Sequence, residues 1–295
     1  MDRTAVLTLT VLCLIWGYQQ VTVKLAMDGI SPVMQSGLRS IIAALLLWIW
    51  MRFHSIRILN GDRSWIPGLF AGLLFALEFG LLYWGLHYTN VSRAILFLYT
   101  SPFVVALGIH FLLPSERLNA LQGIGLAIAF TGIAIIFGDW QSAGGADTLR
   151  GDVLVLLGAV AWGATTLLIR LSALVRIEPS RALFYQLAVS ALLLPLFSFA
   201  LGEPGVVQIT PLVAACILFQ SVVVAFASYL VWFWLVSRYP VPQLAGFSFL
   251  APFFGVVFGV LFLDDPLTVK LIAGGVLVGS GIYLVSRKSG TAEPG

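Results

Sequence analysis

Charged residues are scarce in this sequence of 295 residues. Only 10% of the residues are charged, whereas 60% are hydrophobic. A soluble domain carries roughly 25% charged residues, so this composition excludes water as the main solvent of the chain. A membrane-spanning helix needs about 20 mostly apolar residues, and about ten such helices would use nearly the whole length. We therefore expect an all-α membrane protein with no soluble catalytic domain.

The chain also lacks the residue patterns of metal sites and catalysis. Its two cysteines, Cys13 and Cys216, lie in separate apolar runs, which argues against a disulfide framework or a zinc site. His54, His87 and His110 have no helical pair spacing, and no HExxH, GxSxG or P-loop pattern occurs. We expect no enzyme, no cofactor, no metal and no ATP hydrolysis within this chain.

Basic residues are scattered in short loops, which speaks against a nucleic-acid patch despite a pI near 9.0. The N-terminal run lacks a cleavage site followed by a soluble domain, and we interpret it as the first span. With both termini on the cytoplasmic side of a bacterial inner membrane, basic residues are concentrated inside, as in known membrane proteins. Eleven would lie inside and four, Lys24, Arg93, Arg150 and Lys270, outside.

Apolar runs interrupted by proline, glycine or charge predict ten spanning helices. Continuous runs such as 41–50 exclude a β-barrel, because barrel strands alternate apolar and polar residues. The predicted spans are 4–27, 32–53, 64–88, 92–113 and 117–138 in the first half, and 151–171, 179–201, 210–237, 241–263 and 267–286 in the second.

The two halves are related in sequence at a nearly constant offset. Trp16-Gly17 corresponds to Trp162-Gly163, and Pro102 corresponds to Pro252, offsets of 146 to 150. Because each half has five spans, an odd number, the second half must be inverted in the membrane, an arrangement typical of transporters. We predict a first repeat over 1–138, an outer linker over 139–150, a second repeat over 151–287 and a cytoplasmic tail over 288–295.

Small residues recur every fourth position in several spans, including Gly68, Gly72, Ala76 and Gly80. Such stripes let helix backbones approach closely. We interpret them as packing surfaces within a monomer; the alternative is a dimer formed through Gly275 and Gly279 of the last span.

Three stretches carry a resemblance to a known family. Residues 36–47 read SGLRSIIAALLL, residues 83–94 read YWGLHYTNVSRA, and Ser101-Pro102 precedes Glu116-Arg117-Leu118. The whole chain resembles the EamA family of the drug/metabolite transporter superfamily, and within it the YddG-type exporters of aromatic and other neutral amino acids. This resemblance implies ten helices in two inverted five-helix repeats and metabolite substrates. The second half departs from the pattern, because Gln186 lies near the equivalent of Arg39 and Asp264-Asp265-Pro266 replaces the Glu116 turn.

Among the charges in the predicted spans, Arg39 and Glu78 stand out because they lie away from the span ends, and a charge at a helix centre costs roughly 2.5 to 3.5 kcal/mol on insertion scales. One interpretation is a buried ion pair between the second and third spans. The other is a polar lining that meets the charged ends of a zwitterion, or a proton relay through Glu78.

Aromatic residues and prolines at mid-span predict a cavity. Trp16 and Trp162 lie at equivalent mid-span positions, where an indole N–H needs a partner. Tyr83 and Tyr99 lie at a similar depth, and proline removes a backbone donor. The predicted substrate-binding residues are Trp16, Arg39, Glu78, Tyr83, Tyr99, Pro102, Trp162, Tyr185, Phe247 and Pro252.

From these residues we predict a secondary exporter of aromatic or other neutral amino acids, working by alternating access in contact with membrane lipid. A non-transporting membrane scaffold, a channel, and an exporter of another metabolite or drug class remain the alternatives.

Overall fold

The computed structural model describes residues 3–112, 119–139, 144–238 and 250–286. Regular structure within these residues is helical, and the β-type pairing among them is one isolated bridge between Ile30 and Val206. The helices of the first half are α1 (Arg3–Ala26), α2 (Pro32–Phe53), α3 (Trp65–Tyr88), α4 (Val91–Leu98), α5 (Ser101–Leu112) and α6 (Ala120–Phe137). The second half contains α7 (Ala146–Leu171), η2 (Ala173–Arg176), α8 (Pro179–Ala200), α9 (Pro211–Leu218), η3 (Phe219–Ser228), α10 (Tyr229–Arg238), α12 (Leu250–Leu263) and α13 (Val269–Ser286).

Seven helical segments of the described chain are long and apolar enough to cross a membrane. Two of them are composite, because 91–112 joins α4 to α5 and 211–232 runs from α9 into α10. Three shorter apolar helices, at 120–136, 250–263 and 269–281, lie within other predicted spans. The structure therefore confirms an all-helical protein with multiple membrane spans.

Helix starts follow local rules that are visible in the sequence. Pro32, Pro179 and Pro211 each stand in the first turn, where the missing N–H is not needed by the helix. Asn119 forms a capping box with Gln122, in which each side chain accepts from the other residue's backbone N–H. These signals explain why several helix starts agree closely with the predicted ones.

Two predicted spans are not continuous α-helices. The fourth is interrupted at Tyr99 and Thr100, and Pro102 follows directly in the first turn of α5. Because Pro102 has no N–H, it cannot bond the carbonyl of Leu98, and α4 ends there. The eighth predicted span contains the π-helical stretch η3, in which the helical turns are wider than in an α-helix. Short π-helical segments recur at functional positions in other proteins.

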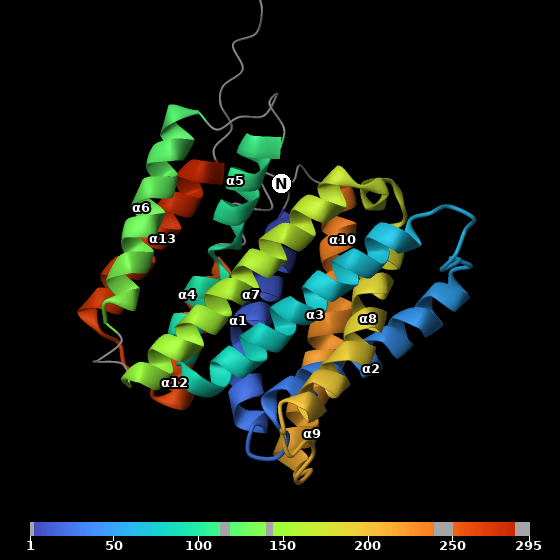
Figure 1. The fold of residues 1–295 in the computed structure, drawn as a ribbon, viewed down its shortest axis with the longest axis horizontal. Helices are drawn as coiled ribbons and strands as arrows, with labels where there is room; N and C mark the ends of the chain where they lie inside the picture. The colour runs from blue at the N-terminus through green and yellow to red at the C-terminus, as the bar shows by residue number, and fades with distance from the viewer. Residues whose placement is uncertain (1–2, 113–118, 140–143, 239–249, 287–295) are drawn as a thin grey trace, which may run out of the picture.

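The helices pack as pairs across the two halves of the sequence (Figure 1). α6 lies beside α13 at one edge, α2 lies beside α8 toward the other, and α3 contacts both α7 and α8. The predicted small-residue surface of α3 contributes to this arrangement, since an added Cβ at Gly72 would lie 2.6 Å from Cβ of Val189 in α8. Its interpretation as a packing surface is confirmed at this position.

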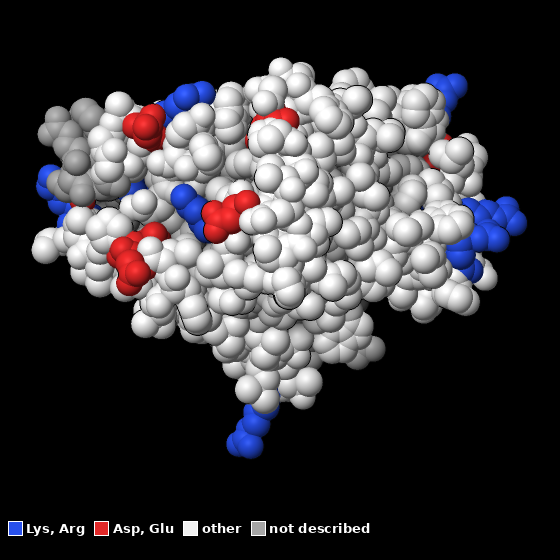
Figure 2. Space-filling model, turned by 90° about the horizontal axis from the view of Figure 1, so that it is seen from below, with Lys and Arg blue, Asp and Glu red and all other residues white. Residues whose placement is uncertain are grey.

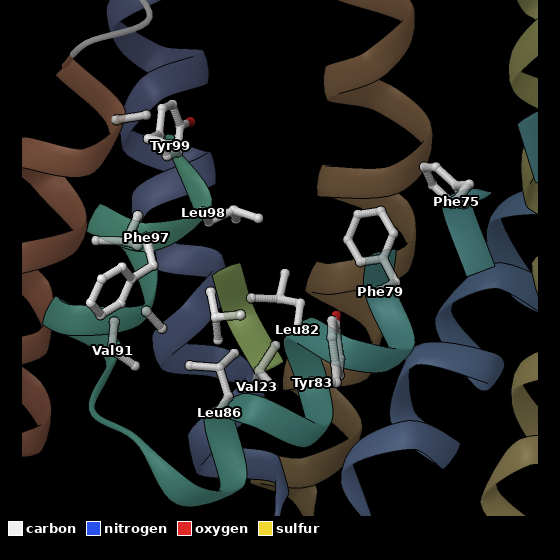
Figure 3. Close-up of a cluster of buried hydrophobic side chains, with 14 of the residues drawn as sticks. Val23, Phe75, Phe79, Leu82, Tyr83, Leu86, Val91, Phe97, Leu98 and Tyr99 are labelled. Atoms are coloured by element: carbon white, nitrogen blue, oxygen red, sulfur yellow. The ribbon is translucent and has the colours of Figure 1, made fainter. Parts of the chain in front are cut away.

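The largest buried apolar cluster extends through helices of both halves of the sequence, and Figure 3 shows the part of it on α1, α3 and α4. Phe75, Phe79 and Tyr83 follow one another at four-residue spacing on α3, with neighbouring ring centroids 4.6 and 6.2 Å apart. At the molecular end that includes α9, charged side chains occur in a few small groups on a mostly uncharged surface (Figure 2).

Candidate functional site

Arg39 of α2 is completely buried, and its guanidinium lies against aromatic rings of α3. Its Cζ is 3.8 Å from the ring centroid of Phe79, close enough for a cation–π contact. One turn further along α3, the Tyr83 hydroxyl accepts a hydrogen bond from Nη1 at 3.5 Å. These contacts hold the guanidinium between α2 and α3.

A chain of hydrogen bonds continues from Tyr83 into the second half of the sequence. The Tyr83 hydroxyl donates to Oε1 of Gln220 in η3 at 3.1 Å, and Nε2 of Gln220 donates to Oε1 of Gln35 at 3.5 Å. Gln35 then donates to the backbone carbonyl of Ile30 at 2.9 Å. Arg39, Tyr83, Gln220 and Gln35 are hereafter called the buried polar chain.

Several buried polar atoms near this chain have no protein partner. They include Nε and Nη2 of Arg39, as well as Oγ of Ser36, one turn earlier on α2. Leaving such atoms unpaired in a low-dielectric interior is costly, so unpaired donors in a folded protein call for an explanation.

Glu78 of α3 is buried but does not form the ion pair that was one of the two interpretations of its charge. Arg39 and Glu78 interact electrostatically, yet no hydrogen bond or ion pair joins them. The reason is local, because the guanidinium stacks on Phe79, the next residue of α3, and its Nη1 turns toward Tyr83. The hydroxyl of Tyr229 at the start of α10 also approaches this guanidinium, but it does not reach hydrogen-bonding geometry with Nε or Nη2.

The two equivalent tryptophans are each half-buried and make different contacts. Nε1 of Trp16 donates to Oγ of Ser228 at 2.9 Å, which supplies the partner that a mid-span indole requires and ties α1 to η3. The ring of Trp162 in α7 meets Tyr99 edge to face, with centroids 5.7 Å apart. Trp162 and Tyr99 therefore lie together, as the sequence predicted.

Pro252 and Tyr99 lie beside an apolar groove of about 570 Å³ between α4, α12 and α13. Pro102 follows the break between α4 and α5 and is partly buried. The predicted site residue Phe247 lies outside the described residues. The groove walls are almost entirely hydrocarbon, so this surface differs in chemistry from the buried polar chain.

Tyr185 belongs to a separate cluster, at the end of α2 that is predicted to face the cytoplasm. Its hydroxyl donates to the backbone carbonyl of Ile58 at 2.7 Å and accepts from Arg181. Arg181 also donates to both carboxylate oxygens of Asp62, at 3.0 and 3.1 Å. The guanidinium lowers the pKa of Asp62 to about 2 through these hydrogen bonds, with help from Ser64. Tyr185 therefore binds the loop that follows α2. It makes no hydrogen bond to the buried polar chain.

A second buried arginine corrects the sequence analysis. Arg93 was counted among the basic residues of the outer side, but its side chain is buried and forms an ion pair with Asp152, which is buried as well. Nε of Arg93 donates to Oδ2 of Asp152 at 3.0 Å, and Thr89 donates to Oδ1 at 2.6 Å. Arg93 also donates to the carbonyl of Ile136 at 2.8 Å, so the pair joins α4, α6 and α7. Short loops made these charges look exposed, whereas tight helix packing covers them.

Gln35 and Gln220 were not predicted as site residues. Both are fully buried amides inside otherwise apolar spans, and that was the signal available in the sequence. No group of three potential metal ligands occurs among the described side chains.

The model of the EamA-like transporter family matches the chain twice, over residues 3–138 and 149–287. An uncharacterized transporter of Bacillus subtilis, YvbV, is 30% identical over 97% of this chain and 92% of its own length. A probable amino-acid metabolite efflux pump of Escherichia coli is 24% identical over 96% of this chain and 94% of its own length. A crystal structure with 19% identity superposes with a TM-score of 0.66 over 97% of this chain and 98% of the other, which shows a shared fold.

Proposed function

The chain belongs to the EamA-like transporter family, and from this premise we propose that it is a secondary exporter of small metabolites, with aromatic or other neutral amino acids as the substrate class. The family and the named relatives are transporters, so the sequence-based exclusion of an enzyme is confirmed. The substrate class and the mechanism are the parts that we propose.

The proposed architecture is ten membrane crossings in two inverted halves. A pair of equivalent helix contacts supports it. An added Cβ at Gly17 would lie 3.0 Å from the carbonyl of Ala251, and one at Gly163 would lie 3.1 Å from the carbonyl of Ser101. The offsets, 146 residues between the glycines and 150 between their partners, are those of the sequence repeat. A two-fold axis relating the two halves would convert the contact of Gly17 with Ala251 into that of Gly163 with Ser101.

The contact between α6 and α13 has the same property. An added Cβ at Gly132 would lie 2.6 Å from the carbonyl of Gly274, and one at Gly281 would lie 2.5 Å from the carbonyl of Gly125. Adding 149 to the numbers of Gly125 and Gly132 gives Gly274 and Gly281, so the two contacts interchange. Inverted repeats supply two near-equivalent packings, one open to each side of a membrane.

The observation that carries the proposal is the buried polar chain itself. It begins on α2 and α3 of the first half, passes through Gln220 of the second, and lies amid apolar helices. Ionisable and polar groups inside a membrane are expensive and commonly mark a solute pathway. Rocking of one half against the other would expose Arg39, Tyr83 and Gln220 to each side in turn.

An amino-acid substrate fits the surrounding chemistry. Phe79, Tyr83, Tyr99 and Trp162 offer ring faces and edges to an apolar or aromatic side chain. The Escherichia coli relative named a probable amino-acid metabolite efflux pump adds independent support. Glu78, a short distance along α3 from these rings, is the acid that would face the ammonium group of a zwitterion.

For orientation, we propose that both termini face the cytoplasm of a bacterial cell and that the protein resides in the inner membrane. The excess of basic residues in the predicted cytoplasmic loops supports this topology.

Counterflow in liposomes tests the proposed function. Purified protein is reconstituted into vesicles loaded with unlabelled phenylalanine, and uptake of external labelled phenylalanine is followed. We expect transient, saturable accumulation that leucine and alanine reduce in competition. Uptake that neither saturates nor responds to internal substrate would indicate a channel, and uptake equal to protein-free vesicles would indicate a scaffold or a different substrate class.

A further inference from the structure

Three arginines are buried among the described residues, Arg39, Arg93 and Arg181, and they differ in what they bind. Arg93 directs Nε and Nη2 to the carboxylate of Asp152, and Arg181 directs both terminal nitrogens to the carboxylate of Asp62. Arg39 is the most deeply buried of the three, and it has no carboxylate partner in the described structure.

The unpaired atoms of Arg39 form a specific recognition edge. Nε and Nη2 lie on the same side of a guanidinium and present two parallel N–H groups, which match the two oxygens of a carboxylate. Arg93 uses this edge to hold Asp152. In Arg39 the opposite side of the group is occupied, because Nη1 bonds Tyr83 and the ring of Phe79 covers one face.

We infer that the Nε and Nη2 edge of Arg39 binds the carboxylate of the transported solute, in place of the protein carboxylate that the other buried arginines possess. This inference deepens the proposed function and depends on it for the identity of the solute. The buried polar chain keeps the edge in position, since Tyr83 is itself fixed by Gln220 and Gln35.

The surroundings favour a monocarboxylate that also carries a positive charge. Arg39 supplies the positive charge of this cluster, and Glu78 is a buried acid nearby with which it interacts electrostatically. A phosphate ester with two negative charges would find one guanidinium here, which can neutralise only one of them. The equivalent position in the second half is Gln186, which bonds the carbonyl of Ala182 in its own helix at 3.0 Å. The solute would therefore bind with its carboxylate toward the first half.

The test compares ligands that differ only in the carboxylate. L-phenylalanine and L-phenylalaninamide, and likewise 3-phenylpropionate and 3-phenylpropionamide, are measured as thermal stabilisers of the detergent-purified protein and as competitors of counterflow. In the unaltered protein the acid of each pair should bind roughly 10- to 100-fold more tightly than the amide, as expected for hydrogen bonds to a charged group. Equal effects of acid and amide would overturn the inference without any variant.

Two substitutions locate the effect. Arg39→Lys retains the charge but removes the paired N–H edge, and it should reduce the preference for acid over amide to a few-fold. Ser36→Asp places an internal carboxylate one turn before Arg39, and it should raise the melting temperature while abolishing acid binding. Arg150→Lys, an exposed arginine that contacts Tyr88 and Trp84, is the matched control and should leave the preference unchanged.

The outcomes separate this inference from the proposed function. If no amino acid shows counterflow but the acids still stabilise the unaltered protein and not Ser36→Asp, the amino-acid assignment fails while the carboxylate site stands. If amino acids are exchanged and the preference for acids survives in both Arg39→Lys and Ser36→Asp, the carrier assignment stands while the role of Arg39 is wrong.

Discussion

Replacing Asp152 by asparagine should be among the most destabilising single changes outside the proposed pathway. The Arg93 and Asp152 side chains are 2% and 0% exposed, so neither charge can be solvated by water when the other is removed. Asp152→Asn leaves the guanidinium of Arg93 without its counter-charge, although the carbonyl of Ile136 still accepts a hydrogen bond from it. Breaking a buried pair in this way costs about 3 to 5 kcal/mol.

The magnitude is best isolated with a double-mutant cycle. Asp152→Asn, Arg93→Met and the double variant are unfolded in mixed detergent micelles, and the free energies of unfolding are compared. We expect the double variant to be more stable than the sum of the single losses predicts, by at least about 1 kcal/mol, because removing both charges leaves neither uncompensated. Asp147→Asn, on the same helix but exposed, is the control and should change stability little. Additive losses would refute the reasoning.

Three further predictions concern other parts of the molecule. Because the folded-state pKa of Asp62 is lowered to about 2 from an unfolded value near 4, its bond to Arg181 stabilises the protein fully above about pH 5 and less as the pH falls toward 2. The stability difference between wild type and Asp62→Asn should therefore shrink over that interval, and a constant difference would show that the interaction does not depend on the charge. Trp162→Ala removes the ring that meets Tyr99, so competition assays should show a loss of preference for phenylalanine over alanine; an unchanged ranking would remove Trp162 from the pathway. Gly132→Leu should separate α6 from α13 and lower the melting temperature by several degrees, whereas Gly123→Leu, with open space around its Cβ position, should not; similar losses would show that the close contact is unimportant.

The helices could be predicted from the sequence because their signals are local. Apolar runs of about 20 residues gave the spans, and Pro32 and Pro179 fixed two helix starts. Pro102 indicated that the fourth span could be interrupted near Tyr99. Where α4 ends and α5 begins also depends on the backbone of α4, which the sequence does not show. The π-helical turns of η3 have no comparable signal.

The site could be predicted only in part, because its contacts join residues far apart in the chain. Tyr99 and Trp162 were expected together on the basis of depth alone, and they are in contact. Depth also suggested that Arg39 would reach Glu78, but side-chain direction decides such a contact, and Phe79 takes the guanidinium instead. Gln220 was overlooked since a lone amide in an apolar run does not reveal its partner.

The inversion of the two halves is the central claim, and labelling of equivalent positions tests it most directly. Asp28 before α2 and Val175 before α8 are both exposed and 147 residues apart, which is the repeat offset at this position. Asp28→Cys and Val175→Cys are treated separately in intact cells with a membrane-impermeant thiol reagent, and wild type, whose Cys13 and Cys216 are buried, gives the background. With inverted halves, Asp28→Cys should react from outside and Val175→Cys should react only after the membrane is permeabilised. Labelling of both from the same side would contradict the inverted architecture.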